Sequence, residues 1–255
     1  MELNGLSVLV TGAGSGLGAA TAETLAKRGA RVAVLDRDAD AAGAVADRIG
    51  GLAVPADVTD EAQVSAALDI AEARHGTPRG VVLCAGIGGA ARISGRDGPH
   101  PLELFERILR VNLIGSFNVL RLAAHRIAAQ PRLANGEGGA VAMTASVAAF
   151  EGQVGQAAYS ASKGGIVGMT LPAARELARA GIRVVTLAPG IFRTPLLGSL
   201  PAADQDALGG AIPFPDRLGD PAEFAALAAH VLENPYLNGE TIRIDGAHRL
   251  PPRWP

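Results

Sequence analysis

Short apolar runs rich in β-branched residues alternate with alanine-rich segments along the chain, and this alternation is the feature that most constrains the fold. Strands are predicted at residues 7–10, 31–35, 80–84, 140–144, 182–187 and 241–244, with 51–54 as a weaker candidate. Periodicity predicts helices at residues 17–28, 61–75, 102–128, 159–180 and 221–232. Such alternation is typical of βαβ units, so we expect an α/β fold with a doubly wound parallel sheet and helices on both faces.

Composition and charge exclude several classes of protein. The 255 residues are 48% hydrophobic and 19% charged, which supplies a core and excludes disorder. A net charge of −2 gives no basic field for nucleic acid, and no apolar run approaches the roughly 20 residues of a membrane helix. The single cysteine forms no internal disulfide, and the five histidines lack metal-ligand spacing. We therefore expect a cytoplasmic single domain over residues 1–255, with no metal and no nucleic-acid or membrane partner.

Two stretches, 86–101 and 191–219, are rich in glycine and proline and show no sustained periodicity. Each follows the carboxyl end of a predicted strand, which is where ligands bind in open α/β sheets. Because long loops at such places are usually functional, we expect residues 191–219 to form a substrate lid. The proline-rich tail, 249–255, is expected to cover a partner subunit.

A glycine-rich turn joins the first predicted strand to the first predicted helix, with the sequence Thr11-Gly12-Ala13-Gly14-Ser15-Gly16-Leu17-Gly18. Glycines let the backbone approach a pyrophosphate, and the helix start adds free N–H groups and a positive dipole end. A tight strand–helix turn without a ligand is the alternative. Asp36 ends the second strand, where a carboxylate can accept hydrogen bonds from a ribose and repel a 2′-phosphate. This favours NAD over NADP, although Arg37 offsets part of the repulsion.

Tyr159 and Lys163 stand four residues apart in a predicted helix, so both project from one face. A neighbouring ammonium lowers the pKa of a phenol from its usual value near 10, so that the phenol can exchange a proton with a substrate oxygen. Ser146 follows the strand at 140–144, where its hydroxyl can hold that oxygen; alone it would be a helix cap. Asn112 lies among apolar neighbours in the helix at 102–128, and a water bridge toward Lys163 would satisfy its amide. An unrelated tyrosine–lysine pair remains the alternative.

The glycine turn, Asn112, Ser146 and the Tyr159/Lys163 pair together resemble the short-chain dehydrogenase/reductase family over essentially the whole chain. The resemblance implies a Rossmann fold with seven parallel strands and hydride transfer between an alcohol and a nicotinamide. In this family the tyrosine is the acid/base, the serine positions the substrate, the lysine binds the nicotinamide ribose, and the asparagine completes a proton relay. The implied cofactor-binding residues are Gly12, Ser15, Gly16, Leu17, Gly18, Asp36, Asp57, Val58, Cys84, Ala85, Gly86, Tyr159, Lys163, Pro189, Phe192 and Thr194.

Residues 144–172, 189–197, 217–223 and 234–240 further resemble the 3-hydroxyacyl-CoA dehydrogenases of this family, which are also described as 17β-hydroxysteroid dehydrogenases. This implies an NAD-dependent enzyme of fatty acid metabolism that interconverts 3-hydroxyacyl-CoA and 3-oxoacyl-CoA. It also implies a homotetramer, and a substrate pocket formed by Ser146, Gln153, Gln156 and Tyr159. The alternatives are an alcohol or steroid dehydrogenase, a 3-oxoacyl-[acyl-carrier-protein] reductase, and a nucleotide-sensing protein without turnover.

One departure from the family pattern lies after the fourth predicted strand, where the chain reads Leu83-Cys84-Ala85-Gly86. Relatives commonly have an asparagine in place of Leu83, so a hydrogen bond that stabilises the sheet is in doubt. Cys84 is expected to be a cofactor neighbour or a core residue and not a reactive thiol.

Overall fold

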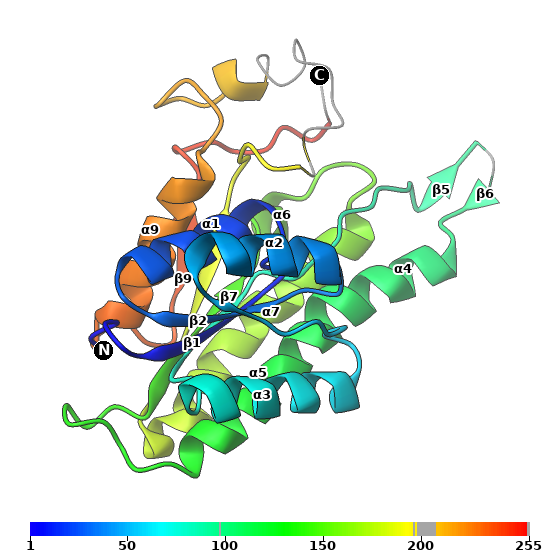
Figure 1. Ribbon diagram of the computed structural model, residues 1–255. Coiled ribbons are helices and arrows are strands. Elements are labelled where there is room, and N and C mark those ends of the chain that lie inside the picture. Colours follow the sequence, from blue (N-terminus) through cyan, green and yellow to red (C-terminus); the bar gives the residue numbers. More distant parts are fainter. Residues whose placement is uncertain (97, 196, 198–207, 254–255) are drawn as a thin grey trace.

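The computed structural model describes residues 1–96, 98–195, 197 and 208–253. The strands are β1 (Ser7–Thr11), β2 (Arg31–Leu35), β3 (Leu52–Ala53), β4 (Gly80–Leu83), β5 (Ser94–Gly95), β6 (Gly98–Pro99), β7 (Gly139–Thr144), β8 (Ile182–Pro189) and β9 (Thr241–Ile244). The helices are α1 (Gly16–Lys27), α2 (Ala39–Ile49), α3 (Glu61–His75), α4 (Leu102–Leu109), π-helix η1 (Arg110–Gly115), α5 (Ser116–Ala128), α6 (Ala148–Glu151), α7 (Ala157–Leu177), 3₁₀-helix η2 (Ala178–Ala180) and α9 (Pro221–Glu233). Figure 1 shows these elements.

Seven strands form one parallel sheet in the order β3-β2-β1-β4-β7-β8-β9. The chain moves outward from β1 through β2 and β3, then returns to β4 and moves outward in the other direction. The switch therefore lies between β1 and β4, where the sheet opens a crevice at the carboxyl ends of its strands. The seven-stranded, single-domain Rossmann fold expected from the sequence is confirmed.

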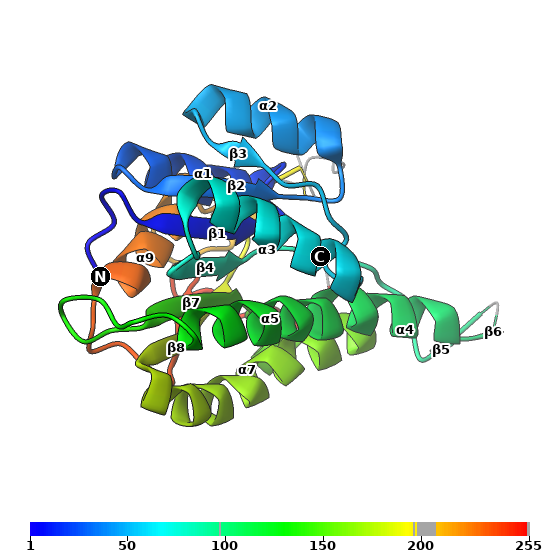
Figure 2. The same cartoon turned by 60° about the horizontal axis from the view of Figure 1, so that its bottom comes forward.

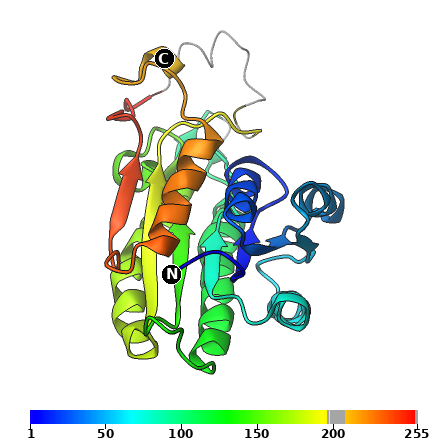
Figure 3. The ribbon, with the colours of Figure 1, turned by 60° about the vertical axis from the view of Figure 1, so that its left-hand side comes forward.

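Helices cover both faces of the sheet, because alternate residues of each strand point to opposite sides. Val8 and Val10 of β1 belong to one core, which α1, α2 and α9 cover. Leu9 belongs to the other core, which α3, α5 and α7 cover. Figure 2 shows the second helix layer, and Figure 3 shows α9 lying over the strands β7 and β8.

Several elements differ from those predicted. The helix expected over 102–128 is continuous but contains the π-helical turn η1, and the strand expected over 51–54 is only Leu52–Ala53. The stretch 86–101 contains the β5–β6 hairpin, which projects from the molecule beside α4 (Figure 2). Helix α2 was not predicted; the Asp38 side chain caps it by accepting a hydrogen bond from the Ala41 N–H at 3.0 Å.

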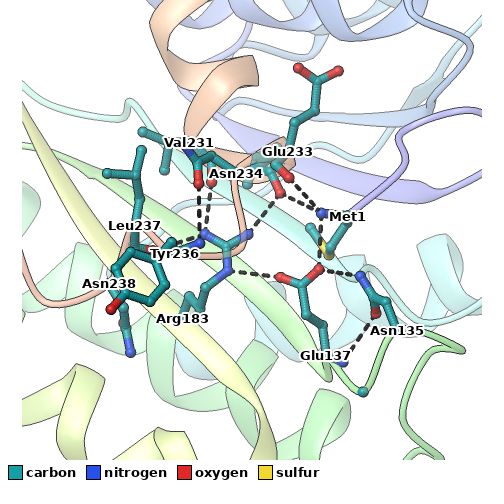
Figure 4. Close-up of polar contacts among 12 residues, drawn as sticks. Met1, Asn135, Glu137, Arg183, Val231, Glu233, Asn234, Tyr236, Leu237 and Asn238 are labelled. Carbon is teal, nitrogen blue, oxygen red and sulfur yellow. Dashed lines mark hydrogen bonds and ion pairs between the residues drawn. The ribbon is translucent and has the colours of Figure 1, made fainter.

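A buried ion-pair network stabilises the end of the sheet opposite the crevice (Figure 4). The Arg183 guanidinium donates to the Glu137 carboxylate at 2.8 Å and to the carbonyls of Val231, Leu232 and Leu237. The Met1 amine lies 3.0 Å from the other Glu137 oxygen. Burial opposes ionisation of Glu137, but hydrogen bonds from Arg183, the Met1 amine and Asn135 outweigh it and hold the Glu137 pKa below its usual value. The network fixes the end of α9 to β7 and β8.

Among the described residues, no helix combines the length and apolar character needed to cross a membrane. In the same part of the chain, no three His, Cys, Asp or Glu side chains come together as a possible metal site.

Candidate active site

The candidate site residues gather at the carboxyl edge of the sheet. Thr11 ends β1, Cys84 follows β4, Ser146 follows β7 and Pro189 ends β8. Because these strands are parallel neighbours, their ends lie side by side around the crevice between β1 and β4.

The glycine turn has the close packing and free N–H groups of an anion-binding turn. A Cβ atom on Gly18 would lie 2.1 Å from the Gly12 carbonyl oxygen, and one on Gly12 would lie 2.6 Å from the Ala85 Cα. Gly12 also has a φ of +61°, which side chains disfavour. Ser15 makes no side-chain cap and the first turn of α1 holds no acidic residue, so the helix N-terminus suits a pyrophosphate.

Thr11 holds this turn against the segment after β4. The Thr11 carbonyl accepts a hydrogen bond from the Cys84 N–H, and its hydroxyl accepts one from the Ala85 N–H, both at 3.2 Å. These bonds secure the segment in which the family's usual asparagine is missing. Burial raises the pKa of the Cys84 thiol to about 11, so this thiol is protonated and unreactive near neutral pH.

The Asp36 carboxylate is oriented by backbone groups at the glycine turn. One carboxylate oxygen accepts a hydrogen bond from the Gly14 N–H at 2.9 Å, and the other accepts one from the Asp38 N–H at 3.1 Å. A Cβ atom on Gly14 would lie 3.0 Å from the same carboxylate, so glycine permits the contact. The next residue, Arg37, is exposed. The carboxylate thus lies beside the glycine turn, where it can accept hydrogen bonds from hydroxyl groups of a ligand.

Tyr159 and Lys163 lie on one face of α7, with the ammonium 5.8 Å from the centre of the Tyr159 ring. Lys163 is only 4% exposed and donates to the Thr144 carbonyl at 2.8 Å. Burial lowers the Lys163 pKa to about 8. Burial also raises the Tyr159 pKa, and hydrogen bonding with Ser146 opposes this increase. The expected lowering of the Tyr159 pKa is therefore wrong for the protein alone, because desolvation of the phenolate dominates.

Ser146 and Asn112 approach the same region from two other elements. The Ser146 hydroxyl lies between β7 and α6, where it accepts the Ala148 N–H at 3.2 Å. Asn112 is fully buried in η1, and its amide exchanges hydrogen bonds with the Ile87 backbone at 2.8 and 3.0 Å and donates to Ser162 at 3.1 Å. These direct bonds satisfy the amide, for which a water bridge was expected. A π-helical turn in a longer helix is frequently found at a functional site.

Gly86 lies between Asn112 and Lys163. A Cβ atom at this position would be 3.2 Å from the Asn112 Oδ1 and 3.5 Å from the Lys163 Nζ. Glycine therefore leaves the approach to both side chains open, and the structure brings Asn112, Lys163 and the segment after β4 together.

The remaining expected cofactor residues line the same edge. Asp57 accepts the Thr59 N–H at 2.8 Å, and the Val58 carbonyl accepts the Asn118 amide at 2.9 Å. The Pro189 carbonyl accepts the Val147 N–H at 3.0 Å. Beyond β8, the Phe192 ring is buried edge-to-face against Phe224. The Thr194 side chain lies close to Gly16 of the glycine turn.

Gln153 and Gln156 lie in the turn between α6 and α7. The Gln156 side-chain carbonyl accepts the Gln153 N–H at 2.9 Å. Gln153 is 5% exposed and donates to the Pro251 carbonyl at 3.0 Å, while the Val154 N–H donates to the Pro252 carbonyl at 2.9 Å. The tail, expected to cover a partner subunit, thus packs on its own chain through residue 252. Of the expected lid, residues 196 and 198–207 lie outside the described residues.

Several supporting residues had no signal in the sequence. The Thr144 carbonyl holds Lys163, and the Ile87 backbone and Ser162 hydroxyl hold Asn112. Thr144 and Ile87 contribute only backbone atoms to these contacts. Because every residue type has the same backbone atoms, the sequence pattern cannot reveal them. The Ser162 contact follows from its place one position before Lys163, on the side of α7 that faces η1.

The short chain dehydrogenase family model matches residues 7–205. The chain belongs to this family. It is therefore an oxidoreductase that uses a nicotinamide dinucleotide. The human 3-hydroxyacyl-CoA dehydrogenase type-2 is 52% identical over 255 residues, which is 98% of each chain.

Two solved structures of family members are similar over nearly their whole length. The 3-hydroxyacyl-CoA dehydrogenase type-2 from Mycobacterium avium has a TM-score of 0.94 and 44% identity, covering 98% of each chain. The 3-ketoacyl-(acyl-carrier-protein) reductase from Brucella melitensis, solved with NADH, has a TM-score of 0.87 and 34% identity, covering 97% of this chain and 100% of the reductase.

Proposed function

We propose that this short-chain dehydrogenase interconverts 3-hydroxyacyl-CoA and 3-oxoacyl-CoA with NAD. The observation that carries the proposal is that Tyr159, Ser146 and Lys163 lie near the carboxyl ends of strands whose parallel neighbour β1 leads into the glycine turn. The high identity to 3-hydroxyacyl-CoA dehydrogenases over the full chain supports the substrate class.

In the proposed oxidation, the substrate 3-hydroxyl lies between Ser146 and Tyr159. Ser146 holds the substrate oxygen, and the Tyr159 phenolate accepts the hydroxyl proton as a C=O bond forms at C3. A bound NAD would supply the redox chemistry, as the acceptor of the C3 hydride. The Lys163 ammonium lies 5.8 Å from the centre of the Tyr159 ring, where its charge offsets part of the cost that burial imposes on the phenolate. Lys163 would also hold ribose hydroxyls, and Asn112 would support the proton route beside it. In the reverse direction Tyr159 returns the proton.

An assay that follows the absorbance of the NADH formed tests the proposed reaction. We expect oxidation of 3-hydroxybutyryl-CoA with NAD⁺ at a kcat/KM at least about tenfold above that with NADP⁺. A steroid alcohol and a 3-oxoacyl thioester on a carrier protein serve as competing substrates. Turnover of either of these without turnover of the CoA thioester would move the assignment to that class.

The proposed NAD preference rests on the Asp36 carboxylate. Asp36→Ser removes the charge that accepts hydrogen bonds from the ribose, and we expect about a 10–100-fold rise in KM for NAD⁺ with a smaller effect on NADP⁺. Asp40→Asn is the matched control, because it removes an exposed charge in the first turn of α2. Equal effects of both variants would show that Asp36 acts only through the local charge.

The homotetramer is also proposed, with the helices of residues 102–128 and 159–180 at the interface. Ile114 and Phe117 support this, because these two apolar residues are about half exposed, at 54% and 50%. Sedimentation equilibrium measures the mass, and a monomer would contradict the proposal. The cytoplasmic location expected from the sequence stays a prediction, which cell fractionation checks.

A further inference from the structure

The segment that follows β9 contacts two segments that leave the carboxyl edge of the sheet, one after β7 and one after β8. We call residues 245–252 the C-terminal clasp. On one side it contacts the described part of the expected lid, residues 208–219. On the other side it contacts the chain between Ser146 and Tyr159. Figure 1 shows the clasp in red beneath the gold and orange loop.

His248 makes the side-chain contact with residues 208–219. Its ring is 5% exposed, and its Nδ1 lies 3.1 Å from the Ala211 carbonyl oxygen. A carbonyl oxygen only accepts, so Nδ1 carries the proton and donates it. Next to this contact, the Phe214 N–H lies 3.4 Å from the Gly246 carbonyl oxygen. A Cβ atom on Gly246 would lie 2.6 Å from the Ile212 side chain, so the clasp packs directly on this segment.

Residues 208–219 have a small apolar core of their own. Its buried members are Leu208, Ile212 and Leu218, with Ile191 and Leu197 packed against them. Backbone hydrogen bonds near 2.9–3.0 Å join Gly219 to Ile191 and Arg193. These bonds hold the Gly219 end of the segment, and the clasp adds polar contacts at Ala211 and Phe214 to those that the segment makes within itself.

The clasp is also fixed to the chain between Ser146 and Tyr159. The Pro251 and Pro252 carbonyls accept hydrogen bonds from Gln153 and Val154. At the start of the clasp, the Asp245 carboxylate accepts a hydrogen bond from the Arg243 guanidinium at 2.7 Å. The same guanidinium forms an ion pair with Glu151 of α6. The clasp therefore connects residues 208–219 to the loop that carries the proposed substrate residues.

We propose that His248 is a positioning residue for the acyl-CoA substrate, which it serves by holding residues 208–219 at a fixed distance from the chain between Ser146 and Tyr159. The inference rests on the proposed function for its kinetic prediction. His248 makes no recorded contact with Tyr159, Lys163 or the glycine turn. Its loss is therefore expected to weaken substrate binding while leaving the chemical step and dinucleotide binding intact.

Three variants separate the hydrogen bond from the shape of the ring. His248→Phe keeps a ring and removes the donor, and His248→Leu removes the donor with a smaller side chain. His248→Asn keeps an N–H near the position of Nδ1. For the first two we expect a rise of about 2–10-fold in KM for 3-hydroxybutyryl-CoA, with kcat and NAD⁺ affinity within about twofold of the parent. We expect the KM of His248→Asn for this substrate to stay close to that of the parent.

Hydrogen exchange read by mass spectrometry gives a measurement that does not depend on the substrate. In the folded parent and variants, we expect faster exchange at residues 208–219 for His248→Phe and His248→Leu, and near-parent exchange for His248→Asn. Unchanged KM and exchange in the two variants without the donor would overturn the proposal, as would an equal loss in all three. If the parent oxidises no 3-hydroxyacyl-CoA, the proposed function fails, while the exchange comparison still decides the role of His248.

Discussion

At the scale of single residues, the site combines groups that burial makes less ionised. Lys163 is nearly inaccessible and donates to the Thr144 carbonyl, and in the described part of the chain no acidic side chain pairs with its ammonium. Burial also disfavours the Tyr159 phenolate. Such shifts are common where a protein positions acids and bases for chemistry, because neutral and charged forms become closer in free energy.

Tyr159→Phe removes the proposed acid/base and keeps the aromatic ring. We expect kcat to fall by at least about 100-fold, because a general acid/base contributes that much or more. NAD⁺ affinity should stay within about twofold, because the glycine turn and Asp36 are unchanged. Stopped-flow turnover and dinucleotide titration measure the two effects. Full activity in this variant would remove Tyr159 from the mechanism.

Lys163→Met should inactivate the enzyme and stabilise its fold at neutral pH. The Lys163 pKa is lowered to about 8, so below pH 8 the folded state bears the cost of a buried charge. As the pH rises from 8 toward the ordinary lysine pKa, the folded state sheds this proton first and the parent becomes relatively more stable. We expect Lys163→Met to gain about 1–3 kcal/mol at pH 7, and the gain to shrink by pH 10.

Urea unfolding at several pH values measures this difference. The exposed Lys27 of α1 supplies a matched control, and Lys27→Met should change the stability by less than about 0.5 kcal/mol at every pH. A gain for Lys163→Met that grew with pH would contradict the burial argument.

At the scale of elements, the sequence predicted the parts that depend on repeated patterns. The main strands and the glycine turn follow from β-branched runs and from the spacing of the glycines. Helix α2 was missed because most of its residues are alanine or aspartate, although its buried residues Ala42, Val45 and Ala46 follow helical spacing and Asp38 caps it. The π-helical turn that contains Asn112 was also missed, because it depends on tertiary hydrogen bonds to Ile87 and Ser162. Asn112 within an apolar stretch was the only hint of this turn.

Two helical glycines should respond oppositely to alanine. Gly18→Ala places a methyl group 2.1 Å from the Gly12 carbonyl, so we expect a loss of several kcal/mol in stability or a collapse of dinucleotide affinity. Gly43→Ala in α2 meets nothing within 4 Å, so it should stabilise the fold by about 0.5–1 kcal/mol. Thermal unfolding and NAD⁺ titration distinguish them. Similar behaviour of the two variants would contradict the packing described for the turn.

At the scale of the whole molecule, distant segments meet at the Arg183–Glu137 pair. It connects the start of β8 with the loop before β7 and the carbonyls at the end of α9. Both side chains are nearly buried, with 7% and 11% exposed. Removing one partner from such a pair leaves an uncompensated charge in a poorly solvated place, so the pair is a point of high sensitivity for the fold.

Arg183→Met should cost about 3–5 kcal/mol at pH 7, and addition of Glu137→Met should recover part of that loss. Since the Glu137 pKa is held below its usual value, the stabilisation is present above the ordinary glutamate pKa and is lost as the pH falls through the folded one. The gap between parent and Arg183→Met should therefore narrow in acid. Arg48→Met, which breaks the exposed Arg48–Glu23 pair, is the control and should cost less than about 1 kcal/mol.

The environment of Cys84 has a practical consequence for spectroscopy. It is the single cysteine of the chain, and its pKa, raised to about 11, slows its reaction with maleimide reagents at neutral pH. A thiol introduced by Phe214→Cys, at a position that is 82% exposed, would then be the sole attachment point for a fluorophore or spin probe. Changes in the emission of the fluorophore or in the mobility of the spin probe would report, in solution, any movement of residues 208–219 when substrate binds. The native thiol would not need to be mutated.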